Sequence, residues 1–139
     1  MRFVRDPHPP AAGLEAITAY VTRRQAGVIV VDGRNANPRV SSILVVDDRR
    51  RVGVGTALYL AAARLACRQF GAPLHSDFER SVAAQAFWEK QVKKGRAVCV
   101  AAASAPVADG SNSGPILNRG GCVQYRLTCP VPTSLRGRR

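Results

Sequence analysis

A short run of arginines and glycines has the residue types that could hold a charged ligand. Residues 50–56 read Arg-Arg-Val-Gly-Val-Gly-Thr and lie between an apolar, β-branched segment and an amphipathic one. Two glycines in a strand-to-helix turn let backbone N–H groups converge on the positive end of the helix without obstruction by Cβ atoms. Three consecutive arginines, Arg49–Arg51, add charge that can grip phosphate oxygens. The turn predicts an anion site, with a tight turn that merely needs small residues as the alternative.

The turn is neither a Walker loop nor a dinucleotide turn, because neither glycine spacing is present. It has the form [Q/R]-x-x-G-x-[G/A], follows the apolar triplet Ile43-Leu44-Val45 and opens a helical pattern. Further on, residues 81–88 read SVAAQAFW, close to the pattern N-x-x-A-x-x-[FL]-Y. In these features residues 28–103 resemble the GCN5-related N-acetyltransferase (GNAT) superfamily, and SD-x-x-RS followed by FWEKQ resembles small acetyltransferase-like proteins of bacteria and phages.

The resemblance implies an acetyl-CoA-dependent N-acetyltransferase that acts on an amine, with the acceptor open. The coenzyme's pantetheine arm would pair with the backbone of the triplet, and its pyrophosphate would lie on the turn amides. A basic signature residue at the turn and a polar residue at the start of the second helix would also lie near the coenzyme. The implied coenzyme-binding residues are Ile43, Leu44, Val45, Arg50, Arg51, Val52, Gly53, Val54, Gly55, Thr56 and Ser81.

The residues that should transfer protons depart from the GNAT pattern. Trp88 stands where the family typically has a tyrosine acid, and an indole N–H cannot serve as that acid. Ser76 stands where a carboxylate base is common. The remaining candidates for acid/base work are His75, Asp77, Glu79 and Tyr125. For each one a structural role is the favoured interpretation: a half-buried strand residue for His75, helix caps for Asp77 and Glu79, and sheet packing for Tyr125.

The net charge of +12 has several sources. All the basic residues except Lys90, Lys93 and Lys94 are arginines, a bias that a GC-rich genome produces by itself. Aromatic residues make up only 6% of the chain, so no aromatic platform for nucleic acid is evident. A basic nucleic-acid-associated protein therefore ranks third among the hypotheses. The second is a GNAT-fold structural or regulatory protein that is weakly active or inactive.

The four cysteines contain no C-x-x-C pair, and the two histidines do not join them at zinc-site spacing. Small buried thiols and no bound metal are the resulting expectations.

No apolar run is long enough for a membrane span and no signal-peptide pattern opens the chain, which favours the cytoplasm, or the host cytoplasm if a phage encodes the protein. The oligomeric state cannot be read from the sequence.

The periodicity of apolar residues predicts an α/β (α+β) fold in which a GNAT-like mixed central sheet has at least one parallel crossover. One domain is expected over residues 1–131, with an abbreviated N-terminal region and a basic, flexible tail at 132–139. Residues 14–22 fit both periods, and strand is favoured there. The expected strands are residues 1–5, 14–22, 28–32, 40–47, 73–77, 97–103 and 122–129. The expected helices are 56–70, with Leu58, Ala61, Ala62 and Leu65 on its apolar face, and 81–94, with Ala84, Phe87, Trp88 and Val92.

Overall fold

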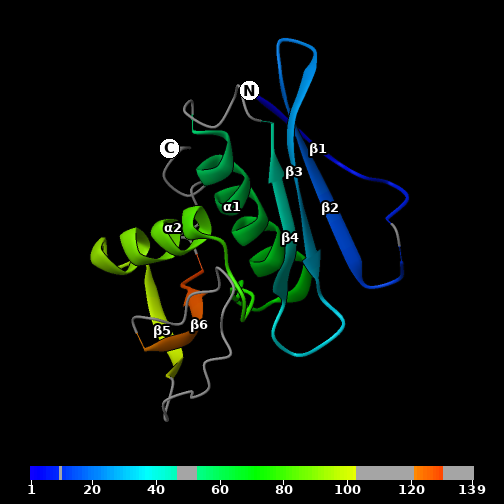
Figure 1. Cartoon of the computed structure of the whole chain (residues 1–139). Coiled ribbons are helices and arrows are strands. Elements are labelled where there is room, and N and C mark those ends of the chain that lie inside the picture. Colours follow the sequence, from blue (N-terminus) through cyan, green and yellow to red (C-terminus); the bar gives the residue numbers. More distant parts are fainter. Residues whose placement is uncertain (10, 47–52, 103–120, 130–139) are drawn as a thin grey trace, which may run out of the picture. The chain divides into compact units, whose positions relative to one another are not determined.

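A computed structural model (Figure 1) describes residues 1–9, 11–46, 53–102 and 121–129 of the chain. These residues form two compact units, which are described one at a time. The first comprises Met1–Leu74 together with the C-terminal segment that begins at Cys129, and the second comprises His75–Thr128. No helix among the described residues is both long and apolar enough to cross a membrane.

The first unit contains a four-stranded antiparallel sheet in the order β1-β2-β3-β4. The strands are β1 (Arg2–Arg5), β2 (Leu14–Val21), β3 (Arg24–Asp32) and β4 (Arg39–Val45). All four were expected from the sequence, although β3 begins four residues earlier than the β-branched run suggested. The ambiguous segment at 14–22 is a strand, and its buried Ile17 pairs with Ile29 of β3.

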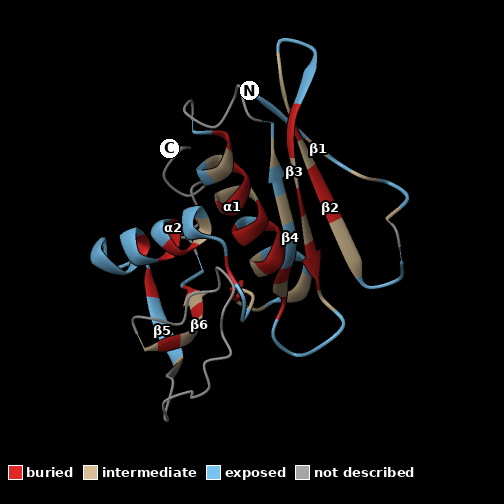
Figure 2. Ribbon diagram, in the orientation of Figure 1, coloured by how far each residue is buried: buried red, intermediate tan, exposed pale blue. Residues whose placement is uncertain are grey.

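Helix α1 (Val54–Leu65) continues into a π-helical turn, η2 (Ala66–Phe70), and ends at Gly71, whose φ of 65° gives the left-handed conformation of a helix C-cap. The helix packs on β2, β3 and β4. Gly27 permits this close approach, because a Cβ there would lie 3.0 Å from Leu58 Cδ1 and 2.8 Å from the Leu44 carbonyl oxygen. Of the expected apolar face, Leu58, Ala62 and Leu65 are buried and Ala61 is half-buried. Figure 2 shows the buried side of α1 and of the central strands.

The second unit contains α2 (Val82–Lys93) and an antiparallel pair, β5 (Ala97–Ala102) and β6 (Cys122–Leu127). The strand expected at 73–77 is wrong, since this segment forms only an isolated bridge between His75 and Arg126. Its ladder stops because the Tyr125 N–H bonds the Ser76 side chain instead of a main-chain carbonyl. The expected parallel crossover is also missing from the described residues, where every strand pair is antiparallel.

The apolar stripe expected on α2 is only partly correct. Phe87 and Trp88 are buried, but Val92 is 40% exposed. Two glutamines that were not expected on the buried face of this helix, Gln85 and Gln91, are buried. A polar side chain can be buried when its hydrogen bonds are satisfied, as those of Gln85 are, so polarity alone did not reveal this face.

The interpretation of the cysteines as buried thiols is wrong, because both pairs form disulfides. Cys67 bonds to Cys129 with a Cα–Cα distance of 5.7 Å, and Cys99 bonds to Cys122 with 5.9 Å. The partners are 62 and 23 residues apart in sequence, so the tertiary fold, and no local spacing motif, brings them together. No group of three or more His, Cys, Asp or Glu side chains in the described part of the chain is arranged to hold a metal ion.

Candidate functional site

Strand β4 lies at an edge of the sheet, next to the start of α1. Its last hydrogen bond to β3 runs from the Val46 N–H to the Ala26 carbonyl oxygen at 2.9 Å. In an antiparallel ladder the main-chain groups of successive residues point alternately toward and away from the partner strand. The N–H and C=O groups of Ile43 and Val45 therefore point to the open edge. The side chain of Leu44, on the same strand, is 64% exposed.

Helix α1 starts at Gly53, whose φ of 80° and ψ of 15° place it in the left-handed region. The Ala57 N–H donates to the Gly53 carbonyl oxygen at 3.0 Å, which closes the first helical turn. No side-chain cap is present among the described residues, and the first turn of α1 carries no acidic residue. The N–H groups of Val54, Gly55 and Thr56 thus lie at the positive end of the helix without a side-chain cap. The remaining expected turn residues, Arg50, Arg51 and Val52, lie outside the described residues.

Gly55 touches little of the protein. Among the described residues, a Cβ built on Gly55 would meet only Val45 Cγ2, at an ordinary contact distance of 3.6 Å, and the φ of Gly55 is not positive. An alanine would fit there, and glycine within a helix costs about 1 kcal/mol relative to alanine. The described part of the fold therefore does not require a glycine at position 55, whereas Gly53 is required by its backbone conformation. The missing Cβ would face the side chain of Val45 at the end of β4.

Ser81, the polar residue expected near the coenzyme, is the N-cap of α2. Its Oγ accepts a hydrogen bond from the Ala84 N–H at 3.1 Å. The expectation that Asp77 or Glu79 caps this helix is wrong, because Ser81 is the residue with extended backbone one position before the first helical residue. Asp77 Oδ1 instead accepts from the Phe78 N–H at 2.8 Å, and Glu79 is exposed.

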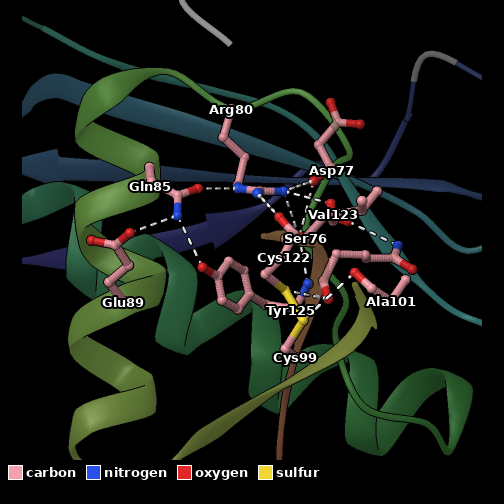
Figure 3. Close-up of a disulfide and its surroundings, with 11 residues drawn as sticks. Ser76, Asp77, Arg80, Gln85, Glu89, Cys99, Ala101, Cys122, Val123 and Tyr125 are labelled. Carbon is pink, nitrogen blue, oxygen red and sulfur yellow. Dashed lines mark hydrogen bonds between the residues drawn. A yellow bond between two sulfur atoms is a disulfide. The ribbon is translucent and has the colours of Figure 1, made fainter. Parts of the chain in front are cut away.

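A buried arginine that was not singled out in the sequence organises the second unit (Figure 3). Arg80 is 4% exposed, and its guanidinium donates hydrogen bonds to side chains and main-chain carbonyls on both α2 and β6. Nε donates to Gln85 Oε1 on α2 at 2.7 Å. Toward β6, Nη1 donates to the Val123 carbonyl oxygen at 2.9 Å and Nη2 to the Cys122 carbonyl oxygen at 3.0 Å. Nη1 also donates to the Asp77 carbonyl oxygen at 2.6 Å and to Ser76 Oγ at 3.3 Å. Arg80 is the arginine of the SD-x-x-RS pattern, but that pattern by itself does not indicate burial.

The Arg80 contact fixes how Gln85 is oriented. A guanidinium only donates, so the Gln85 atom that faces it must be the oxygen. Gln85 Nε2 then points the other way and donates to Tyr125 Oη at 2.9 Å and to Glu89 Oε2 at 2.8 Å. The Tyr125 oxygen is thus an acceptor, and its own proton has no acceptor among the described residues.

Trp88, at the position of the family's tyrosine acid, is 1% exposed and packs in the core of the second unit. Its ring stacks on that of Tyr125 with centroids 5.9 Å apart and an interplanar angle of 10°. His75 is 5% exposed. Among the four acid/base candidates, Tyr125 is buried on β6 and His75 is buried next to that strand, whereas Glu79 is at the surface.

Comparisons with solved structures place the chain in a known fold. One match is a nourseothricin acetyltransferase, with a TM-score of 0.57 and 25% sequence identity. The aligned region comprises 86% of this chain and 67% of that protein. It covers 95% of a GNAT family acetyltransferase from Elizabethkingia anophelis with acetyl-CoA bound, using 90% of its own length, at a TM-score of 0.55 and 14% identity.

A third match, to a candidate streptothricin acetyltransferase from Bacillus anthracis in complex with acetyl coenzyme A, has a TM-score of 0.51 at 23% identity. It uses 62% of this chain and spans only 56% of that protein. No protein-family model and no curated protein sequence matches the chain. The structural likenesses show the GNAT fold that the glycine turn and the second helix resembled.

Proposed function

We propose that the protein is an N-acetyltransferase that uses acetyl-CoA as its cosubstrate and an amine as its acceptor. The observation that carries this proposal is Gly55, a helical glycine that the fold does not need, placed between the positive end of α1 and the open edge of β4. An approaching phosphate group explains why a side chain is missing there. The acetyl-CoA in two matched GNAT structures supports the identity of that ligand.

Each part of the site would contact a different part of the coenzyme. The outward main-chain groups of Ile43 and Val45 can pair with the amides of a pantetheine arm, as an added strand would. The N–H groups of the first turn of α1 can bind the pyrophosphate. Acetyl-CoA would supply the thioester, and the chain has to hold that thioester where an uncharged amine can reach its carbonyl carbon.

This chain lacks the tyrosine that serves as the general acid in a typical GNAT enzyme, because Trp88 stands at that position. A thiol has a pKa of about 8.5, so a thiolate can leave near neutral pH without an acid, and losing a general acid costs roughly 10²- to 10⁴-fold in rate. Of the four candidates, Tyr125 carries a hydroxyl whose oxygen accepts a hydrogen bond from Gln85 Nε2 at 2.9 Å. We therefore expect a slow enzyme.

Calorimetric titration with acetyl-CoA tests the coenzyme site. Gly55→Glu should abolish binding by placing a carboxylate where the phosphates are expected, while the fold is retained, because a glutamate in the first helical turn suits the helix dipole. Gln69→Glu adds the same charge at an exposed position of η2 and should bind as the wild type does. If the wild-type protein fails to bind acetyl-CoA, the proposal is wrong.

A second candidate is a GNAT-fold protein that binds the coenzyme without turnover. It is favoured by the fact that Ser76 and Trp88, which stand at the usual positions of base and acid, are both buried and committed to packing. Release of free thiol from acetyl-CoA over a panel of amines that includes nourseothricin separates the two candidates. Binding without thiol release would favour the second.

A further inference from the structure

We propose that the Cys99–Cys122 disulfide is a thiol-exchange site, at which a low-molecular-weight thiol forms a mixed disulfide with Cys99. This inference does not depend on the proposed acetyltransferase activity. The two cysteines differ in how far the residue is exposed to an incoming thiolate. Cys99 is exposed on β5, whereas Cys122 is only 6% exposed on β6.

Thiol–disulfide exchange requires direct attack of a thiolate on one of the two sulfur atoms, so access selects the sulfur that is attacked. The incoming thiolate would form a bond to Cys99 Sγ, the Cys99–Cys122 bond would break, and its electron pair would leave with Cys122 Sγ, which then takes a proton from water. The number of disulfide bonds is unchanged, so no external oxidant or reductant is needed. The net charge of +12 favours the approach of an anionic thiol.

The surroundings of Cys122 can receive the freed thiol. Its sulfur lies 3.1 Å from the Gln124 carbonyl oxygen, a distance at which a newly formed S–H can donate a hydrogen bond. The Cys122 carbonyl oxygen already accepts from Arg80 Nη2 at 3.0 Å. The main chain of Cys122 is therefore hydrogen-bonded while the disulfide is intact, and its thiol has a hydrogen-bond acceptor once the disulfide has opened.

Strand β6 has hydrogen-bonded anchors besides the disulfide (Figure 3). Arg80 bonds the carbonyls of Cys122 and Val123, and Ser76 bonds Tyr125 further along the strand. By contrast, the β5–β6 ladder shifts register between Cys99 and Ala101 and again between Ala101 and Ala102. Opening the bond would thus release the end of β5 while β6 stays in place, so exchange can occur in the folded protein.

Incubation of the oxidised protein with glutathione, and in a second arm with free coenzyme A, tests this proposal. Excess thiol is removed, free cysteines are alkylated, and peptides are mapped by mass spectrometry. We expect the thiol on Cys99 and the alkyl group on Cys122, with an unchanged circular dichroism spectrum. A control with Cys99→Ser and Cys122→Ser together should keep the fold and lose this adduct. An adduct in both arms identifies a general thiol site, and an adduct in one arm identifies the thiol that the site accepts.

Three results would overturn the proposal. The first is a native protein in which Cys99 and Cys122 are alkylated before any thiol is added, because the disulfide would then be absent. The second is an adduct on Cys122 instead of Cys99. The third is no adduct with either thiol until the circular dichroism spectrum shows unfolding. None of these results depends on acetyl-CoA turnover, so a failure here is distinguishable from a failure of the proposed enzyme activity.

Discussion

Ser76 and Tyr125 are joined by two hydrogen bonds that use different parts of the serine. The Ser76 N–H donates to the Tyr125 carbonyl oxygen at 2.9 Å, and the Tyr125 N–H donates to Ser76 Oγ at 2.9 Å. The serine is fully buried and stands where GNAT enzymes often have a carboxylate base. Its side chain acts as a substitute for a main-chain acceptor, which is a structural role.

Ser76→Ala should destabilise the protein by about 1–3 kcal/mol, because it leaves the buried Tyr125 N–H without its acceptor. The free energy of unfolding in urea measures the effect. Ser42→Ala, at an exposed position of β4, is the control and should change stability by less than about 0.5 kcal/mol. Equal stability of the two variants would contradict the structural role of Ser76.

Arg80→Lys should cost about 2–4 kcal/mol although it keeps the positive charge. An ammonium group has three donors on one atom and cannot reach the acceptors that the planar guanidinium bonds on α2 and β6. Thermal unfolding followed by circular dichroism measures the loss. Arg64→Lys, at an exposed position of α1, should unfold at nearly the wild-type temperature. A similar melting temperature for both lysine variants would show that charge alone suffices at Arg80.

The elements of the first unit were predictable because their signals are local. Alternating β-branched residues mark β3 and β4, and the change to a helical period together with Gly71 marks the length of α1 and η2. The GNAT fold followed from the glycine turn, a motif of a few adjacent residues. Each of these inferences uses residues that interact with near neighbours in sequence.

The errors involve contacts between distant residues. Gln85 is buried because Arg80 and Tyr125 satisfy its amide, and Tyr125 is 40 residues away. A strand was expected at 73–77, but this segment contacts β6 through a single bridge, in which side chains of Ser76 and Gln124 take the place of further main-chain hydrogen bonds. The disulfides likewise join residues that only the fold brings together. Hydrogen bonds and disulfides between distant side chains leave no periodic pattern in the sequence, so they could not be predicted from it.

Two glycine substitutions two residues apart should change stability in opposite directions. Gly53→Ala forces an alanine to adopt a φ of 80° and should cost about 1–2 kcal/mol. Gly55→Ala fits against Val45 and should stabilise the helix by up to about 1 kcal/mol. Urea denaturation of both variants measures the difference. If Gly55→Ala were destabilising, the claim that the fold does not need this glycine would be wrong.

Asp32 should make stability depend on pH in the acidic range. Arg34 bonds its carboxylate through Nε, Nη2 and the backbone N–H, at 2.9–3.0 Å, and lowers the pKa of Asp32 from 3.8 to about 2, even though burial acts in the opposite direction. A group whose pKa is lower in the folded state stabilises the fold while it is ionised in both states. This contribution is complete above about pH 4 and is lost as the pH falls toward 2.

The variant Arg34→Ala should therefore be less stable than the wild type near neutral pH, and the gap should narrow between pH 4 and 2. Urea unfolding at a series of pH values measures it. Arg23→Ala removes the same charge from an exposed position in the turn between β2 and β3 and should show a gap that does not depend on pH in this window. A gap for Arg34→Ala that stays constant down to pH 2 would rule out Asp32 as its source.

Replacing Cys67 and Cys129 together by alanine should lower stability by about 4 kcal/mol, which loop-closure entropy gives for a bridge between residues 62 apart. The disulfide restricts the unfolded chain more than the folded one, so the loss appears mainly as a higher entropy of the unfolded state. Urea unfolding with and without a strong reductant measures it. The reductant should destabilise the wild type by more than it destabilises the variant, which retains only the shorter Cys99–Cys122 bridge. Equal sensitivity of the two proteins to the reductant would mean that the Cys67–Cys129 bond does not form in solution.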